Sequence, residues 1–587
     1  TPHELGHSLG RLQDEYTYRA RGVAGDAYDG EEPNSIHHTV LTEEQMRVEQ
    51  RKWWRWLGEP SESGGTIGRY PGGQSRTSGI WRPSRHSMMI SLGYYFDQVS
   101  RERMAARISS QVELISASNR TDAPLRSDEV VWVETAHPVY HELVVTWQVD
   151  GQPVPNTRNS RSLDLNALRL GPGPHTVGVE VVDPTEFVRD AVVRDTSFTA
   201  TRSWTVSAEL ASASNVPVAF TMSTDTTRAV GGTDVVYVET THPTNRVQDV
   251  TWRLDGRVVS NPANGRALNV AALNLSSGTH RLSATVTAPG GSSGESQTLS
   301  WTVDNAGPTV EHTLSEPVTS IERPDGSRHY FFRDQFTMKL DAVDDQPGYV
   351  VSEFRVNGDG WHHYYGWPDA SPGSPFLFTP RGTTIKELVY GSLSAEGLSP
   401  QPWEPREPGW GTHLIEYRAR DAAGNIGATN AFKVTFTPSP TCTTVVTGEH
   451  AGELAVRSGV ICVDRATVSG PINVSPGASL FVANATINGA VTTSGAVAVE
   501  LIGTTVDGTV RIGGTTGSVT LFGSVLNREV VLSDNRTAAS AILAGNRLGS
   551  TLTCDGNTMS IVDLGAPNAV RAGVAVQCPM PEPGRPE

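Results

Sequence analysis

Apolar and polar residues alternate in short stretches between residues 111 and 304, and this period of two predicts β-strands with one buried face. One such stretch, Val144–Val149, contains Trp147 and runs into the turn Asp150-Gly151, a rhythm typical of antiparallel sheets. The pattern then returns with an offset of 105 residues. The positions that repeat are 131–135 (VWVET), His137, Pro138, Trp147, Asp150, Leu168 and His175, which return as 236–240 (VYVET), His242, Pro243, Trp252, Asp255, Leu273 and His280. The sequence therefore predicts two consecutive copies of one β module.

The two copies, residues 111–207 and 208–304, resemble immunoglobulin-like (Ig-like) β-sandwich modules without the cysteine pair of antibody domains. The repeated tryptophans then belong to the two cores. Structural roles are expected for four histidines of the copies, because His137 and His242 each precede a proline at a strand end, while His175 and His280 each open a strand.

A third β module is predicted over residues 305–438. It carries FRVNGDGW at 354–361 and IEYRARDAAGN at 415–425, and it resembles the Ig-like modules appended to many bacterial secreted hydrolases. A cluster of rings in this module has two interpretations: a platform for a carbohydrate or another cell-surface polymer, and ordinary alternation along a strand. The cluster consists of Trp361, His362, His363, Tyr364, Tyr365 and Trp367. Zinc binding by the two histidines is not expected, because neighbours on a strand point to opposite faces.

Beyond Pro438 the period changes again. From Gly470, runs of Val, Ile, Leu, Ala and Thr are interrupted by turn residues about every 19 to 22 positions. The turns lie at Asn488-Gly489, Asp507-Gly508, Asn527 and Gly549. This spacing predicts a small parallel β-helix over residues 439–578, followed by a tail at 579–587. We expect two local disulfides, Cys442 with Cys462 and Cys554 with Cys578, to fasten the two terminal coils.

Candidate chemistry lies in the first sixteen residues, TPHELGHSLGRLQDEY. His3, Glu4 and His7 form an H-E-x-x-H element, which on a helix places both imidazoles on one face at a spacing that suits one zinc ion. Glu4 lies beside the first histidine and is placed to act as general base on a metal-activated water. The alternative is a chance match on an ordinary amphipathic helix.

A third ligand requires a break in the helix. We expect Gly10 to adopt the left-handed conformation that ends the helix and turns the chain back. That turn would bring Gln13, Asp14 and Glu15 towards the ion, and a carboxylate oxygen is an acceptable third zinc ligand that leaves the fourth position for water.

The string at residues 3–16 resembles the IgA-peptidase family of bacterial zinc metallopeptidases, which belongs among the metzincins. Three further stretches agree with that family: KWWRWL at 52–57, IWRPSRHSMM at 80–89 and FDQVSRERM at 96–104.

The resemblance covers about the first hundred residues and implies that residues 1–110 are the C-terminal part of a metzincin-like α+β catalytic domain. It further implies zinc ligation by His3, His7 and Asp14, with Glu4 catalytic, and a methionine turn at Met89, with Met88 as the alternative.

Two further helices are expected in this head. Thr42 and Gln45 form a capping box, and Gly58 and Pro60 would end the helix that it starts. Trp53, Trp54 and Trp56 would then lie near the end of this helix, mostly as core residues. A closing helix would present Phe96, Val99, Met104 and Ile108 on one face.

Composition narrows the possible partners. The 587 residues should hold four or five domains, and 58 glycines with 37 prolines favour a mainly β, multidomain chain. A net charge of −16 without a basic cluster argues against nucleic acid. The chain has no run of eighteen apolar residues, so no membrane span is expected. Paired cysteines in an acidic chain point to an extracellular setting, secreted or on the cell surface, and the resemblance implies a bacterium.

The resulting hypothesis is a secreted zinc-dependent metalloendopeptidase that hydrolyses peptide bonds of protein substrates. The rival is a non-catalytic surface or adhesion protein with a remnant peptidase head. Since Thr1 opens inside the motif, we also expect the sequence to be truncated at its N-terminus. As written it would retain zinc weakly and cleave little, because a metzincin head normally has an upstream sheet that holds the substrate.

Overall fold

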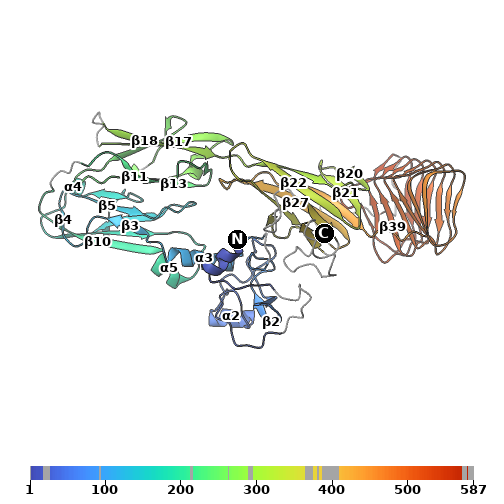
Figure 1. Ribbon diagram of the computed structural model, residues 1–587, viewed down its shortest axis with the longest axis horizontal. Coiled ribbons are helices and arrows are strands. Elements are labelled where there is room, and N and C mark those ends of the chain that lie inside the picture. The colour runs from blue at the N-terminus through green and yellow to red at the C-terminus, as the bar shows by residue number, and fades with distance from the viewer. Residues whose placement is uncertain are drawn as a thin grey trace.

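The computed structural model describes residues 2–16, 27–90, 94–211, 216–261, 264–288, 295–363, 375–379, 382–385, 409–571 and 578. The chain is mainly β. A small N-terminal head (residues 2–110) is followed by three β-sandwiches and a C-terminal β-solenoid, which forms one end of the elongated molecule (Figure 1). The predicted tail, residues 579–587, lies outside the described residues.

Within the described residues of the head lie three helices and one antiparallel hairpin. They are α1 (Pro2–Ser8), α2 (Glu43–Glu49), β1 (Tyr70–Gly73), β2 (Arg76–Arg82) and α3 (Gln98–Ser109). The capping box of α2 is present, since Thr42 Oγ1 accepts from the Gln45 N–H and the Gln45 side chain accepts from the Thr42 N–H.

The expected length of α2 is wrong. The helix ends at Glu49, because Gln50 adopts a left-handed φ of 51° and its N–H caps the Met46 carbonyl. The tryptophans therefore lie in turns beyond the helix. Trp53 and Trp56 are nevertheless buried in the core of the head, as expected, whereas Trp54 is only half-buried.

The expected face of α3 is also wrong in part. Asp97 caps the helix by accepting the Ser100 N–H, and Val99 is buried. Phe96, however, precedes the helix, and Ile108 is 45% exposed. Only the first turn of α3 is buried. The apolar spacing along the helix therefore predicted a longer contact with the core than the structure has.

The first two modules share one Ig-like topology. Module 1 packs the sheet β3-β5-β8 against β4-β10-β9-β6-β7, and module 2 packs β11-β13-β16 against β12-β18-β17-β14-β15. The strands of module 1 are β3 (Ile115–Ser118), β4 (Leu125–Arg126), β5 (Val130–Thr135), β6 (Val144–Val149), β7 (Gln152–Pro153), β8 (Ser162–Asp164), β9 (His175–Val182) and β10 (Thr199–Ser207). Those of module 2 are β11 (Phe220–Ser223), β12 (Val230–Gly231), β13 (Val235–Thr240), β14 (Asp249–Leu254), β15 (Arg257–Val258), β16 (Ala267–Asn269), β17 (Thr279–Thr287) and β18 (Ser296–Asp304). Trp147 and Trp252 are fully buried in the two cores, as predicted.

One helical turn follows the equivalent strand in each copy, α4 (Leu165–Leu168) in module 1 and η3 (Val270–Leu273) in module 2. Module 1 also has helix α5 (Ala191–Ser197), between β9 and β10. This insertion faces the head (Figure 1).

Repeated residues also form the contact between modules 1 and 2. His137 Nε2 lies 3.1 Å from Glu239 of module 2, and His242 Nε2 lies 3.0 Å from Glu134 of module 1. His242 stacks on Trp132, with ring centroids 3.7 Å apart. Because each contact has a counterpart 105 residues away, the two copies face each other with approximate two-fold symmetry. The structural roles expected for these two histidines are confirmed.

His175 and His280 also play the expected structural role. Each lies at the start of a strand and bonds to an aspartate in a hairpin turn 25 residues earlier, His175 to Asp150 of the β6–β7 turn at 2.7 Å and His280 to Asp255 of the β14–β15 turn at 2.9 Å. Both copies thus contain the same contact between a strand start and the turn of a neighbouring hairpin.

Module 3 elaborates the same sandwich. Its sheets have the orders β19-β22-β25-β26 and β20-β21-β28-β27-β23-β24. The strands are β19 (Thr309–Leu314), β20 (Thr319–Glu322), β21 (Arg328–Arg333), β22 (Phe336–Val343), β23 (Val351–Val356), β24 (His362–His363), β25 (Phe376–Thr379), β26 (Gly382–Ile385), β27 (Gly411–Arg420) and β28 (Asn430–Thr437). Aromatic side chains, including Phe336, Phe354 and Phe436, fill its core.

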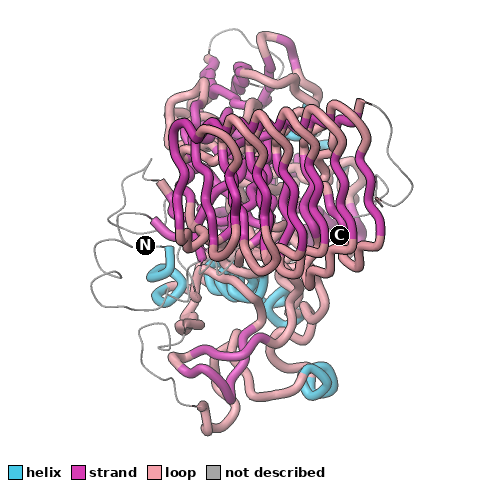
Figure 2. Tube along the Cα trace, turned by 90° about the vertical axis from the view of Figure 1, so that its right-hand side faces the viewer, coloured by secondary structure: helices cyan, strands magenta, loops and turns pink. Residues whose placement is uncertain are grey.

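The solenoid confirms the predicted parallel β-helix. Figure 2 shows its coils stacked side by side, with every strand parallel to the next. One sheet consists of β30 (Leu454–Val456), β32 (Ile472–Val474), β35 (Val491–Ser494), β38 (Val510–Gly513), β41 (Val530–Ser533) and β44 (Leu552–Asp555). The other contains β29 (Thr444–His450), β31 (Val460–Val468), β33 (Ser479–Ala483), β34 (Thr486–Ile487), β36 (Ala498–Ile502), β37 (Thr505–Val506), β39 (Ser518–Phe522), β40 (Val525–Leu526), β42 (Ala541–Ala544), β43 (Arg547–Leu548), β45 (Ile561–Val562) and β46 (Ala569–Val570).

Both predicted disulfides are present, at the two ends of the solenoid. Cys442 pairs with Cys462 and Cys554 with Cys578, with Cα atoms 5.8 Å and 5.1 Å apart. The predicted turns at 488–489, 507–508, 527 and 549 all follow the second short strand of a coil, so they form one corner of the helix.

The head touches two modules that are distant in sequence. On one side, the Arg189 guanidinium of module 1 lies 3.6 Å from the centroid of the Trp56 ring. On the other side, His86 Nε2 lies 2.9 Å from Asp359 Oδ2 of module 3. Since modules 1, 2 and 3 also contact one another in order, the head and the modules close a ring, visible left of the solenoid in Figure 1.

Candidate metal centre

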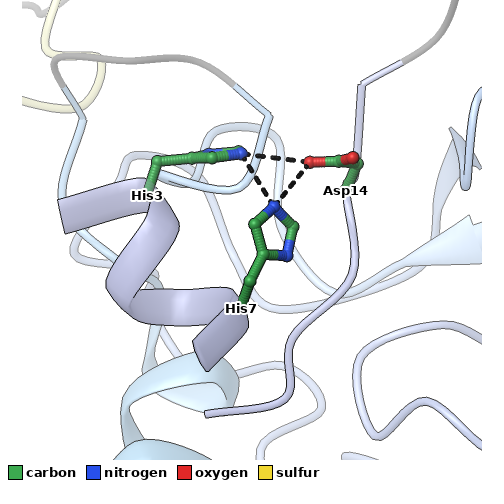
Figure 3. A group of neighbouring side chains, drawn as sticks. All are labelled: His3, His7 and Asp14. Atoms are coloured by element: carbon green, nitrogen blue, oxygen red, sulfur yellow. Dashed lines mark hydrogen bonds and ion pairs between the residues drawn. The ribbon is translucent and has the colours of Figure 1, made fainter. Parts of the chain in front are cut away.

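Three donor atoms from the N-terminal motif converge on one point (Figure 3). His3 Nε2 and His7 Nε2 lie 3.1 Å apart, and Asp14 Oδ1 lies 3.0 Å from the first and 3.2 Å from the second. In a tetrahedral zinc centre with bonds of about 2.0–2.1 Å, neighbouring ligand atoms lie about 3.3 Å apart. The triangle formed by these three atoms therefore has the size that a zinc ion requires.

Hydrogen bonds fix which nitrogen of each ring faces the centre. His3 Nδ1 donates to the Met88 carbonyl at 2.9 Å, and His7 Nδ1 donates to the Leu12 carbonyl at 2.8 Å. With each Nδ1 used as donor, the neutral form of each imidazole carries its lone pair on Nε2, the atom that faces the centre. Two lone pairs and a carboxylate oxygen form a donor set suited to a divalent cation.

The charges of the three groups are coupled. The hydrogen bond to Asp14 raises the pKa of His3, an effect that burial opposes. For Asp14, burial acts to raise the pKa. The hydrogen bonds from His3 and Tyr16 and the nearby histidines outweigh burial, so the pKa of Asp14 is lowered. Asp14 is therefore ionised at neutral pH, as a metal ligand must be.

The helix break differs from the expected one. Arg11, not Gly10, adopts the left-handed conformation, with φ 52°. Its N–H donates to the His7 carbonyl at 3.1 Å, and the Leu12 N–H donates to the Gly6 carbonyl at 3.1 Å. Glycine is needed at position 10 for space, since a Cβ there would lie 2.8 Å from the Gly6 carbonyl oxygen.

Both methionines of the predicted turn support the helix that carries the two histidines, one by its side chain and one by its backbone carbonyl. Met89 is fully buried beneath α1, where a Cβ on Gly6 would lie 2.7 Å from its Sδ. Met88 supplies the carbonyl that orients His3. The sulfur under the helix is thus that of Met89, the position that the sequence favoured over Met88.

The two alternatives to Asp14 point elsewhere. Glu15 is completely buried, and burial together with the charge of Asp97 raises its pKa well above the usual range. Gln13 accepts a hydrogen bond from the side chain of Gln74. Neither joins the cluster formed by the histidines.

Glu4 follows His3 on α1, and its side chain is exposed. The sequence interpretation missed two neighbours of the site. The Tyr16 ring stacks near His3, with centroids 6.4 Å apart. Buried His37 donates from Nε2 to the Gln13 carbonyl at 2.9 Å and so holds the turn that presents Asp14. The paired histidines at 37 and 38 were the only signal for this support, since they lie in a polar stretch without a motif.

The aromatic cluster of module 3 does not form an open platform in its described part. The Arg418 guanidinium covers the Trp361 ring at 3.9 Å from its centroid. His362 and His363 pack edge-on against Tyr94 and Tyr95 of the head. The remaining members, Tyr364, Tyr365 and Trp367, lie outside the described residues.

A second group of possible ligands among the described residues consists of carboxylates alone. Asp304, Asp344 and Asp345 meet where modules 2 and 3 join. The pKa of Asp304 is raised to about 6. Burial is the largest cause, and the negative charges of Asp421, Asp344 and Asp345 add to it.

Comparison with family models and with curated proteins gave no match. Among solved structures, the chain is similar to the fibronectin(III)-like modules of Clostridium thermocellum CbhA, with 13% identity over 37% of this chain and 95% of that one and a TM-score of 0.19. It is also similar to extracellular domains 3–5 of Drosophila OTK, with 11% identity over 55% and 97% of the two chains and a TM-score of 0.18. A third similarity is to Bacteroides ovatus SGBP-B in complex with a mixed-linkage heptasaccharide, with 13% identity over 55% and 68% and a TM-score of 0.11.

Scores this low carry no argument, so the Ig-like assignment rests on the strand orders. None of the helices in the described ranges has the length and apolar character to cross a lipid bilayer.

Proposed function

We propose that the chain is a secreted zinc-dependent metalloendopeptidase with zinc bound by His3, His7 and Asp14. The observation that carries the proposal is the convergence of two Nε2 lone pairs and one ionised carboxylate oxygen, each ring fixed by its own backbone hydrogen bond. The resemblance of residues 3–16 to the IgA-peptidase family supports the same reading, with residues 1–110 as the C-terminal part of a metzincin-like head.

The roles of the residues follow from their positions. A bound zinc ion supplies Lewis acidity, which lowers the pKa of a water and polarises a peptide carbonyl. Glu4, exposed on the same helix, would serve as the general base towards the attacking water and as the proton donor to the leaving amine. The carbonyls of Met88 and Leu12 hold both imidazoles in the required tautomer.

The test is a Glu4→Gln variant, which keeps the size of the side chain and removes the base. We expect zinc binding to stay and cleavage of an unstructured protein such as casein to fall about 10²- to 10⁴-fold. Glu44→Gln, on the exposed surface of α2, is the matched control and should cleave like the wild type. Equal cleavage by the Glu4 variant would contradict the proposal.

The same experiment separates the rival function. A wild-type chain that holds zinc but cleaves no protein under any condition favours a surface or adhesion protein with a remnant head. The disulfides at both ends of the solenoid are consistent with an oxidising compartment for either function.

A further inference from the structure

We propose that module 3 is part of the metal centre, because Asp359 and Glu353 of this module hold the head loop that orients His3. Both are positioning residues. The inference rests on the zinc site of the proposed function and goes beyond it, since it assigns a role in metal binding to an Ig-like module more than 250 residues away in sequence.

The first contact joins Asp359 to His86. Asp359 Oδ2 accepts from His86 Nε2 at 2.9 Å and lies 3.7 Å from Arg85 Nη1. Burial alone would raise the pKa of Asp359, but the hydrogen bond from His86 and the nearby positive charges lower it, so the carboxylate is ionised. The His86 ring stacks flat on Tyr94, with centroids 4.4 Å apart and planes 4° from parallel.

The second contact joins Glu353 to Tyr95. The Tyr95 hydroxyl donates to Glu353 Oε1, and Arg418 Nε donates to Glu353 Oε2 at 2.9 Å. Glu353 is completely buried, so this carboxylate depends on these partners. The Tyr95 ring also packs edge-on against His363, at 4.6 Å between centroids.

A short path leads from these contacts to the metal centre. The Tyr95 carbonyl accepts from the Met88 N–H at 2.9 Å, and the Met88 carbonyl accepts from His3 Nδ1, also at 2.9 Å. A chain of three hydrogen bonds thus runs from Glu353 to His3. Tyr95 links the first bond to the second, and the backbone of Met88 links the second to the third.

The two surfaces fit at backbone distance. A Cβ on Gly360 of module 3 would lie 2.1 Å from the Ser63 carbonyl oxygen of the head, and a Cβ on Gly64 would lie 2.3 Å from Asp359 Oδ1. No larger side chain fits at either position. Residues 63–64 of the head therefore pack directly against residues 359–360 of module 3, and this packing fixes Asp359 against the head.

The head needs this support because its own regular structure is small. α1 has seven residues, too few for a helix to be stable alone, and both histidines lie on it. Partners that orient a metal-binding histidine commonly change metal affinity about 10- to 100-fold when they are removed. Loosening the Met88 carbonyl should therefore weaken zinc binding without removing a ligand.

The experiment uses the full chain with Asp359→Asn, Tyr95→Phe and the combination. Each substitution preserves size: Asp359→Asn removes the negative charge that faces His86 and Arg85, and Tyr95→Phe removes the hydroxyl that donates to Glu353. Asp341→Asn, at an exposed ion pair with Lys339 on module 3, is the matched control. Zinc affinity is measured by competition with a chelator, and the visible spectrum of the Co²⁺-loaded protein reports ligand geometry.

We expect the combined variant to bind zinc about 10- to 100-fold more weakly and to show an altered Co²⁺ spectrum, with the control unchanged. Each single variant should show a smaller change in the same direction. Wild-type affinity and spectrum in the combined variant would overturn the inference while leaving the proposed function intact. A wild-type chain that binds no zinc would instead refute the proposed function, and this inference with it.

Discussion

The head and the solenoid obtain their stability in opposite ways. The described solenoid residues form one cluster of 32 buried residues, in which each coil stacks on the next. The described part of the head has a cluster of seven buried residues, one short hairpin and three helices. It also contacts the insertion of module 1 and the edge of module 3. The solenoid is therefore stabilised by local repetition, whereas the candidate site depends on residues far away in the chain.

The largest expected effect separates the two regions. Leu501 is fully buried in β36, and Leu501→Ala should lower the free energy of unfolding of the solenoid by about 2–5 kcal/mol through lost burial and a cavity. Zinc affinity should not change. Urea unfolding followed together with chelator competition tests both points, with Val497→Ala, 44% exposed near the same coil, as control. A parallel loss of zinc would break the comparison.

The disulfide at the C-terminal end should matter next. Cys554 and Cys578 close a segment with a sequence separation of 24, so replacing both by serine should cost up to about 3 kcal/mol by the loop-entropy estimate. Hydrogen exchange should rise in the last coils and stay unchanged in the head. Uniformly faster exchange over the whole chain would show that the solenoid is not an independent unit.

A buried asparagine tests how much the side-chain hydrogen bonds between neighbouring coils stabilise the solenoid. Asn546 accepts from the Ser524 N–H at 2.9 Å and donates to the Leu521 carbonyl at 2.8 Å, so Asn546→Ala should cost about 1–3 kcal/mol. Asn527→Ala is the control, since its side chain bonds to Asp507 at the exposed corner. Equal thermal stability of the two variants would mean that the buried bonds contribute little.

The smallest expected effect concerns Asp304, at the contact between modules 2 and 3 within the ring that the head and the modules form. Asp304 has its pKa raised from 3.8 to about 6 by burial and then by Asp421 and other carboxylates. Between these values the folded state holds a proton that the unfolded state has released, so the contribution of this group to stability is lost as the pH rises through about 4 to 6.

Asp304→Asn should therefore stabilise the chain at pH 7 by about 1–2 kcal/mol, after allowance for screening by water, and by almost nothing at pH 4. Denaturant unfolding at both pH values, with EDTA present, measures the difference. The same difference at both pH values would exclude titration of Asp304 as its cause.

The sequence predicted those structural features that are determined by residues close together in the chain. The turn spacing predicted the solenoid, and the 105-residue offset predicted two sandwiches, because strand alternation and turns are short-range signals. The motif predicted His3 and His7 as neighbours because they lie one helical turn apart, whereas the choice of Asp14 over Gln13 and Glu15 came from the resemblance to the family. The end of α2 was missed because Gln50 adopts a left-handed conformation that its residue type does not favour.

The supports of the site were missed for a different reason. Nothing near Asp359 or Glu353 in the sequence refers to the head, and only tertiary packing brings them to His86 and Tyr95. His37 likewise acts through the backbone of Gln13, a contact that carries no motif. Long-range polar contacts of this kind leave no periodic trace in a single sequence.

Bound zinc in the Asp14→Ala and Glu15→Gln variants tests the central claim most directly. Elemental analysis of the full chain, equilibrated with excess zinc, should find one ion per wild-type molecule and per Glu15→Gln molecule, because Glu15 is buried away from the cluster. Asp14→Ala should lose the metal, because it removes the oxygen that lies 3.0 Å from His3 Nε2 and 3.2 Å from His7 Nε2. Full zinc in Asp14→Ala, with loss in the Glu15 variant, would contradict the assignment.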